Sequence, residues 1–450
     1  MIKRLVPSWR PAPWHSPRWL ARSGGLALCL MAFFKILWPE VGDPIETLMA
    51  VAGLIALLAC GRGLRNSAAL WLLLAAIAVQ VLSWTLGYFN HPQWISAIPE
   101  VDRLAKLFIF IAVAWWLGGS THNTLLVWGL AVVGYLIATY IYGGGWQEWW
   151  RGLQGQRVGF GIRNNQHASM LFGVVLVGVV AFAPRWIGWP RVATWRLVSW
   201  LAVLLLCAVG VVIGQTRAVW LALALALPLM GAMWLVWQVR HVGLARLRRT
   251  LLIAAGAGLV ALTALLAAFQ DTLSERLTAE SQVIGEVLEG NLENVPYSSI
   301  GIRINTWVAA AEWIGERPLV GWGGQGRSLV IDETPWLPEF VKKNYGHLHN
   351  FFIETWVAYG LLGLAVMGAL VIWVGRATWL AWRGGAMPND MALFACSFFV
   401  YWVIVNQFES YLSFSTGVIV NNLIVGGLVT HYWRWLSAPP SPSREERPGQ

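Results

Sequence analysis

The sequence predicts an all-α protein that crosses a membrane many times, and three observations support this fold class. Of the 450 residues, 57% are hydrophobic and only 12% are charged, and the mean hydropathy is +0.57, which is typical of a membrane protein. Apolar stretches of about 20 residues, the length that crosses about 30 Å of hydrocarbon, recur along the chain. Many of the 31 tryptophans lie near the ends of these stretches, where an indole ring prefers the headgroup region.

Apolar runs predict about twelve membrane spans. The predicted spans are residues 24–38, 46–60, 67–88, 104–118, 123–142, 168–184, 197–213, 218–238, 250–269, 351–375, 391–411 and 417–436. The chain is thereby divided into spans one to nine with short loops over residues 1–269, a large loop over 270–350, spans ten to twelve over 351–438 and a tail over 439–450. The tail is rich in Pro, Ser and charged residues and is expected to be disordered.

Short basic loops indicate which side faces the cytoplasm. With the N-terminus inside, the loops on that side carry many arginines and almost no acids: Arg62, Arg65, Arg185, Arg191, Arg196, Arg240, Arg246, Arg248, Arg249, Arg376 and Arg383. Both termini are therefore expected in the cytoplasm, with residues 1–22 as a basic tail and first helix rather than a cleaved signal peptide. The net charge of +10 follows from this topology without a nucleic-acid partner, although the basic face would attract anionic membrane lipids.

The loop over residues 270–350 is the only predicted outer segment long enough to form a structure of its own. Residues 271–293 are acidic and predicted to be helical, and residues 300–313 form an amphipathic pattern that ends before Pro318. The glycine-rich stretch at residues 321–326 lacks the Lys-Ser/Thr of a phosphate-binding loop, so it is interpreted as a hinge or tight turn. The four cysteines all lie in apolar stretches and predict neither disulfides nor a metal site.

Cations on the predicted outer side break the charge pattern and indicate an anion site. Arg217 lies in a tight turn between two apolar spans, where a charge is costly unless an anion meets it. The other outer cations are Arg151, Arg157 and Arg163 in one loop and Arg303, Arg317, Arg327, Lys342 and Lys343 in the large loop. Guanidinium groups bind phosphates bidentately, so a phosphate or diphosphate ligand is predicted. Arg151 and Arg317 are more simply explained as surface or headgroup contacts, and spacing alone leaves the role of Arg303 open.

The stretch His347-Leu348-His349-Asn350 stands directly before a predicted span. No acidic or cysteine partner lies at ligand spacing along the chain, so no metal is predicted. Neighbouring cations would lower the pKa of His349 and keep it neutral, as a general base requires. Asn350 suits the N-cap of the following helix. The sequence has neither an Asp-x-Asp pair for a metal-held sugar nucleotide nor a common hydrolase motif.

These residues carry a resemblance to the O-antigen ligase and polymerase superfamily of bacterial envelope enzymes. His349-Asn350, nine residues and then Gly360-Leu361-Leu362-Gly363 resemble the His-Asn, nine-residue, Gly-x-x-Gly pattern associated with the ligase. The stretches RINTW from Arg303, PLVGWG from Pro318 and GQTR ending at Arg217 resemble segments of the same family. The topology is similar over most of the chain, whereas the sharp motifs cover residues 214–220 and 301–363.

The resemblance implies a glycosyltransferase that moves a polysaccharide from undecaprenyl diphosphate to the lipid A-core oligosaccharide at the periplasmic face of the inner membrane. It implies that Arg217 and Arg303 hold the diphosphate and that His349 assists the acceptor hydroxyl, with no metal or other cofactor. His347 and Asn350 are further candidates for substrate contacts, and the charge argument adds Arg157 and Arg163. Direct attack by the hydroxyl would invert the anomeric centre, and a diphosphate leaving group needs no ATP in that compartment.

Alternative functions remain open at this level. An O-antigen polymerase or a protein O-oligosaccharyltransferase would share the donor and differ in the acceptor, and the His-Asn and Gly-x-x-Gly spacing favours the ligase. A twelve-helix transporter would need paired charges near the middle of the membrane. Few charges fall within the predicted spans, namely Lys35, Glu354 and Glu409. An enzyme at the membrane surface is therefore favoured.

Overall fold

The computed structural model confirms an all-α membrane protein. It describes residues 9–438 apart from residues 11, 13, 15, 16, 190, 292 and 293 and most of 243–280. Over these residues the chain is helical and has no strand. The predicted span at 250–269 falls almost entirely outside the described residues, as do the first part of the acidic segment and the tail.

Eight described helices are long and apolar enough to cross a membrane. They are α1 (Arg18–Leu37), α2 (Pro39–Cys60), α3 (Ala68–Asn90), α6 (Thr121–Tyr142), α10 (Thr194–Ile213), α11 (Arg217–Val242), α18 (Phe351–Arg383) and α19 (Asn389–Phe408). Each coincides with a predicted span. The total of twelve stays a prediction, because three further predicted spans have a different character and a fourth is not described.

One of these three, residues 104–118, is a broken helix rather than a continuous span. It consists of α4 (Asp102–Ala105), η2 (Lys106–Phe108) and α5 (Phe110–Leu117). Asn422 accepts a hydrogen bond from the Phe110 N–H at 2.9 Å and donates one to the Lys106 carbonyl at 2.8 Å. Asn421 donates to the Leu107 carbonyl at 3.3 Å. Backbone groups freed by the break are thus satisfied inside the protein, because lipid offers them no partner.

The other two are α8 (Asn165–Ala181), which is short and apolar, and α20 (Ser415–Ser437). Residues 416–431 of α20 are all buried, and this helix packs against α5 and α18. It therefore forms the centre of the bundle rather than a lipid-facing span.

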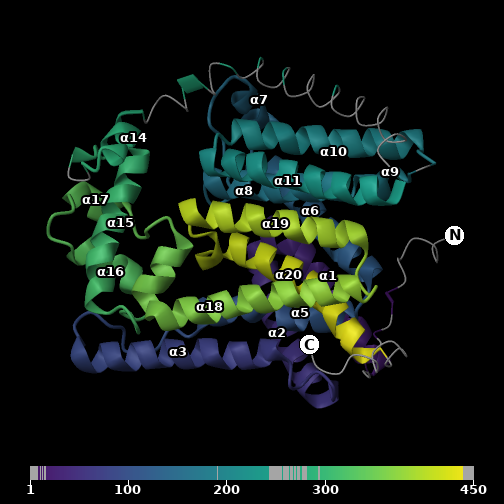
Figure 1. Cartoon of the computed structure of the whole chain (residues 1–450), viewed down its shortest axis with the longest axis horizontal. Helices are drawn as coiled ribbons and strands as arrows, with labels where there is room; N and C mark the ends of the chain where they lie inside the picture. The colour runs from purple at the N-terminus through teal and green to yellow at the C-terminus, as the bar shows by residue number, and fades with distance from the viewer. Residues whose placement is uncertain are drawn as a thin grey trace.

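Short helices gather at one end of the bundle. They are α14 (Ser281–Leu288), α15 (Ser299–Glu316), α16 (Gly326–Glu333) and α17 (Glu339–Asn344) (Figure 1). The short helix α9 (Ala183–Ile187), which contains Arg185, lies at the opposite end of the bundle. The predicted amphipathic helix is confirmed as α15. Trp313, Trp322, Val330 and Leu337 form a second hydrophobic core there, against which Trp94 packs.

The three charges interpreted as lying within spans are instead at helix ends, so that interpretation was wrong. Lys35 is in the last turn of α1 and pairs with Asp43 at 2.7 Å and with Glu46. Glu354 is in the first turn of α18, and Glu409 follows the last residue of α19. The run at residues 391–411 was drawn past Phe408, the last residue of α19, and so took in Glu409. Lys35 and Glu354 do lie inside their helices, but in a terminal turn.

Replacing Asn422 by alanine is expected to lower the free energy of unfolding by about 2 kcal/mol, because it leaves the buried Phe110 N–H unpaired and removes one of the hydrogen bonds to the Lys106 carbonyl. Thermal unfolding in detergent measures the effect. The control is Asn90→Ala, since Asn90 is exposed and bonds only within its own helix. Equal melting temperatures for the two variants would contradict the role given to Asn422.

Candidate active site

The candidate site is built where five segments meet at the α15–α17 end of the bundle. The residues before α18 supply the two histidines, and the turn after α19 supplies Glu409. α15 carries Arg303, the loop before α8 carries Arg157 and Arg163, and α11 begins with Arg217. Segments far apart in the sequence thus converge on one end of the bundle, as the outer placement of these residues predicts.

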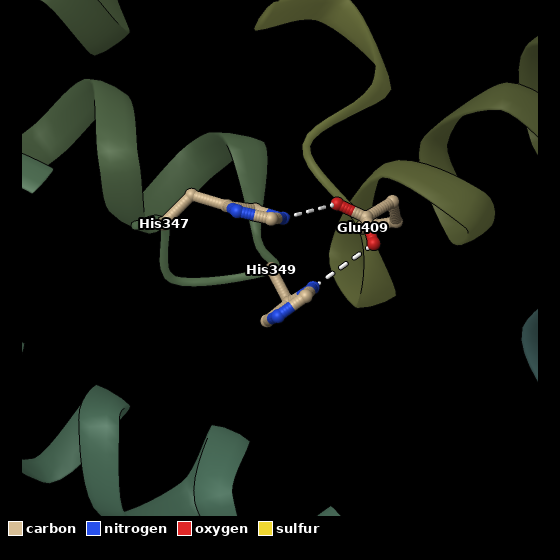
Figure 2. A group of neighbouring side chains, drawn as sticks. All are labelled: His347, His349 and Glu409. Atoms are coloured by element: carbon tan, nitrogen blue, oxygen red, sulfur yellow. Dashed lines mark hydrogen bonds and ion pairs between the residues drawn. The ribbon is translucent and has the colours of Figure 1, made fainter. Parts of the chain in front are cut away.

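Glu409 joins the two histidines. His347 Nε2 and His349 Nδ1 each lie 2.9 Å from one of its carboxylate oxygens. The Glu409 side chain is fully buried, whereas the His347 and His349 side chains are 21% and 12% exposed. Figure 2 shows the carboxylate to one side of the two neighbouring rings, with one oxygen turned toward each imidazole. No acidic partner lies at ligand spacing along the chain, and this one escaped the sequence analysis because it comes from 60 residues beyond His349.

This geometry fixes the state of His349. An ionised carboxylate only accepts hydrogen bonds, so Nδ1 carries the proton that it donates to Glu409. The other ring nitrogen, Nε2, then keeps its lone pair, and Figure 2 shows it on the side of the ring away from Glu409. A neutral imidazole held in this tautomer can accept a proton from a hydroxyl group.

Burial is the main cause that lowers the pKa of His349. The hydrogen bond and the charge of Glu409 oppose it, and His347 and Arg303 lower the pKa further. The predicted effect of neighbouring cations is therefore present but secondary. Burial acts to raise the pKa of Glu409, but the hydrogen bonds from His347 and His349 outweigh it and hold that pKa well below its ordinary value. Glu409 is thus ionised and His349 neutral at neutral pH.

The backbone around His349 is held from two sides. Leu348 donates its N–H to Glu354 at 3.0 Å, and its carbonyl accepts from the Trp307 indole at 2.7 Å. Asn350 caps α18 as predicted, since its side chain accepts from the N–H groups of Phe352 and Ile353. His349 itself has a φ of +52°, a left-handed conformation that costs energy in residues other than glycine and that recurs at functional sites.

The predicted arginines line the same end of the bundle. Arg303 donates to the Gln166 side chain at 3.1 Å, and its charge acts on His349. Arg157 donates to the Gly214 carbonyl at 3.3 Å, three residues before Arg217. Arg163 also has a left-handed backbone, with a φ of +50°.

The ring of Phe414 separates Arg163 from His347. The Arg163 guanidinium carbon lies 3.7 Å from the ring centroid, and the His347 ring lies 5.3 Å from the same ring. A cation held in this way on an aromatic face stays charged and fixed in direction. Arg163 is therefore placed beside the histidine cluster, and a donor phosphate bound to it would lie near the imidazoles.

Glu354 and Arg327 also lie at the site. Arg327 had been counted only among the outer cations, and Glu354 had been interpreted as a charge inside a span. Glu354 accepts from the Ser410 hydroxyl at 2.6 Å and the Ser413 hydroxyl at 3.1 Å, and Arg327 lies 3.5 Å from it. It thereby ties the turn after α19 to the start of α18. The signal in the sequence was an acid one turn after the His-Asn pair, at the start of an apolar helix.

Two arginines set aside as surface contacts behave differently. Arg151 is exposed and bonds to Gln156, as expected of a surface residue. Arg317 packs over Trp322, with 5.1 Å from its guanidinium carbon to the ring centroid, and its Nη1 atom is buried. Arg317 is thus partly buried, with one nitrogen of its guanidinium group enclosed, and its interpretation as a surface or headgroup contact stays a prediction.

The donor atoms of His347, His349 and Glu409 lie within 4.8 Å of one another, close enough to hold a metal ion in principle. A bound cation would have to break both hydrogen bonds of Glu409 and would lie near the charges of Arg163 and Arg303. The arrangement fits two imidazoles that each donate a hydrogen bond to one carboxylate better than it fits a cation site. A site without metal stays a prediction.

Residues 200–368 match the family model described as O-antigen ligase. This match supports the resemblance to that superfamily over this part of the chain. The matched part contains Arg217, Arg303, both histidines and Asn350, whereas Arg157, Arg163 and Glu409 lie outside it. An uncharacterized protein of Haemophilus influenzae is 30% identical over 115 residues, which are 25% of this chain and 28% of the relative. The chain therefore spans less than a third of that relative's length.

Replacing Glu409 by glutamine is expected to lower the pKa of His349 further, because both the hydrogen bond and the charge of Glu409 raise it. Histidine-labelled protein examined by NMR over a pH series measures this change. The exposed His122 serves as an internal control that should titrate alike in both proteins. A raised or unchanged pKa for His349 would contradict the role assigned to the carboxylate.

Proposed function

We propose that this protein is an O-antigen ligase. It would transfer a polysaccharide from undecaprenyl diphosphate to the lipid A-core oligosaccharide at the periplasmic face of the inner membrane. The observation that carries the proposal is His349, a neutral imidazole with a free Nε2, held by a buried carboxylate beside arginines at one end of a membrane bundle. A base next to a cluster of guanidinium groups suits attack of a hydroxyl on a glycosyl diphosphate.

In the proposed reaction, Arg217 and Arg303 bind the diphosphate of the donor, assisted by Arg157 and Arg163. The acceptor hydroxyl gives its proton to His349 Nε2 while its oxygen attacks the anomeric carbon. The new C–O bond forms as the bond to the diphosphate oxygen breaks, which inverts the anomeric centre and releases undecaprenyl diphosphate. The arginines stabilise the charge that grows on the leaving group, a task that a metal ion performs in other enzymes.

Glu409 supports this step by charge and by orientation. When His349 takes up the proton, the carboxylate 2.9 Å from Nδ1 stabilises the imidazolium. The same hydrogen bond keeps Nε2 turned away from Glu409 before the reaction. His347 and Asn350 complete the proposed set of substrate-binding residues. His347 bonds to Glu409 next to His349, and Asn350 caps α18.

The alternatives differ in the acceptor or in the class of protein. A polymerase or a protein O-oligosaccharyltransferase would use the same base and arginines on a different hydroxyl. A transporter is disfavoured by an observation, since Lys35, Glu354 and Glu409 all lie at helix ends and not near the middle of a span.

Replacing His349 by asparagine is expected to lower the transfer rate by about 10²- to 10³-fold, because the base is lost while a residue that tolerates the left-handed backbone is kept. The measurement is transfer by the purified protein in liposomes supplied with lipid-linked glycan and lipid A-core. The control is His122→Asn, at an exposed position in the first turn of α6. Normal transfer by a folded His349→Asn protein would remove the base from the mechanism.

The same assay gives the pH dependence. His349 acts in its neutral form, and burial lowers its pKa. Activity should therefore fall as pH drops through a midpoint below about 6.5, the ordinary histidine value. A midpoint above that value would contradict a neutral, buried base.

Transfer is also expected to persist in EDTA, with a rate within about twofold of the untreated protein, because guanidinium groups bind the diphosphate. Loss of transfer that Zn²⁺ or Mg²⁺ restores would assign His347, His349 and Glu409 to a metal instead. If the protein elongated free lipid-linked glycan or modified a peptide but left lipid A-core untouched, one of the alternative acceptors would replace the ligase.

A further inference from the structure

The helix that follows His349 is interrupted at Gly360, ten residues after Asn350 in the sequence. Gly360 of α18 has φ +63° and ψ −164°, far from helical values. A break of this kind frees two backbone N–H groups and two carbonyls inside the bundle, where they need partners.

One loop supplies all four partners. Leu361 and Leu362 donate their N–H groups to the carbonyls of Pro318 and Leu319, at 2.9 and 3.2 Å. In return, Trp322 N donates to Val357 O at 2.9 Å and Gly323 N donates to Ala358 O at 2.8 Å. We call this pairing of residues 318–323 with residues 357–362 the clasp.

The clasp explains two glycine motifs that the proposed reaction leaves unused. A Cβ atom on Gly360 would lie 2.1 Å from the Leu319 carbonyl carbon, and one on Gly321 would lie 2.5 Å from that of Ala358. Both glycines also have positive φ values. Each motif lacks a side chain at the place where the other backbone approaches, so the two glycines depend on one another.

Ser83 of α3 bonds both halves of the clasp. It is fully buried, and its hydroxyl donates to Ala358 O at 2.9 Å and accepts from Gly323 N at 3.0 Å. A single side chain from a distant span thereby ties the loop to the broken helix.

The clasp joins the two segments that position Arg303 and His349, both of which serve the proposed reaction. The loop follows α15 directly, and α15 carries Arg303 and the Trp307 that holds the Leu348 carbonyl. The other half of the clasp belongs to α18, which begins at the cap next to His349. The position of the clasp therefore sets α15 against α18, and with them Arg303 against His349.

We propose that Ser83 is a positioning residue that acts through the clasp to keep Arg303 and His349 in register. This inference rests on the proposed function, in which these two side chains serve the same transfer step. Loss of the Ser83 hydroxyl leaves the substrate-binding groups in place and loosens their mutual alignment, so it affects the rate of transfer and not the binding of substrates.

Ser83→Ala is expected to lower kcat about tenfold while both KM values stay within about twofold of wild type. The matched control is Ser397→Ala, since Ser397 is buried but bonds only to a carbonyl of its own helix. Ser83→Cys keeps the size of the side chain and weakens its hydrogen bonds, so it carries the same test at an intermediate kcat if the alanine variant folds poorly. An unchanged kcat, or a change confined to KM, would overturn the proposal.

A second measurement does not depend on activity. Spin labels at Ala311 of α15 and Ile372 of α18, both exposed, report the distance between these helices in an otherwise cysteine-free protein. Ser83→Ala should broaden the distance distribution, and Ser397→Ala should not. An unchanged distribution in Ser83→Ala would overturn the clasp as the alignment device while leaving the proposed function intact. A wild-type protein that transfers no glycan would overturn the function alone.

Discussion

A fully buried carboxylate at the end of α19 organises the end of the bundle that holds the candidate site. A charge taken out of water is costly unless close partners compensate it, and Glu409 finds two imidazoles, each 2.9 Å from one oxygen. To reach it, the chain must bring the turn before α18 against the turn after α19. Glu354 holds these two turns together through Leu348, Ser410 and Ser413. The orientation of His349 follows from this arrangement, whereas burial keeps its ring neutral against the charge of Glu409.

The distance along the chain between the His349-Asn350 motif and the Gly360–Gly363 motif has a physical reason in the structure. Nine residues separate Asn350 from Gly360, so the two lie ten helical steps apart, a rise of about 15 Å. The segment between them is a short rigid helix, with His349 just before its first residue and the clasp at its last turn. The spacing of the motif is therefore the length of that helix. Residues 318–323, which precede the helix in the sequence, form the other half of the clasp.

Much of this architecture could be predicted from the sequence, because it depends on local patterns. Apolar runs located the spans that the structure describes, and the His-Asn pair, Arg303 and Arg217 were found from charge, spacing and resemblance. What could not be predicted depends on residues that meet only after folding. Glu409 looked like a charge inside a span, and its partners lie 60 residues away. The break at residues 102–117 was hidden in an apolar run, because the amides that satisfy it belong to α20, more than 300 positions further on.

The burial of α20 bears on how the topology of such proteins is deduced. Residues 416–431 make almost no contact with the surroundings of the bundle, so this helix can carry amides, hydroxyls and an imidazole that lipid would exclude. It is consequently absent from the described helices that pass as apolar crossings. A count that is limited to long apolar helices leaves out α20, just as it leaves out α8 and the broken helix at residues 102–117. Each helix left out reverses the side of the membrane on which such a count places the C-terminus. For chains with an enclosed central helix, sidedness is better taken from the distribution of arginines than from the tally of hydrophobic stretches.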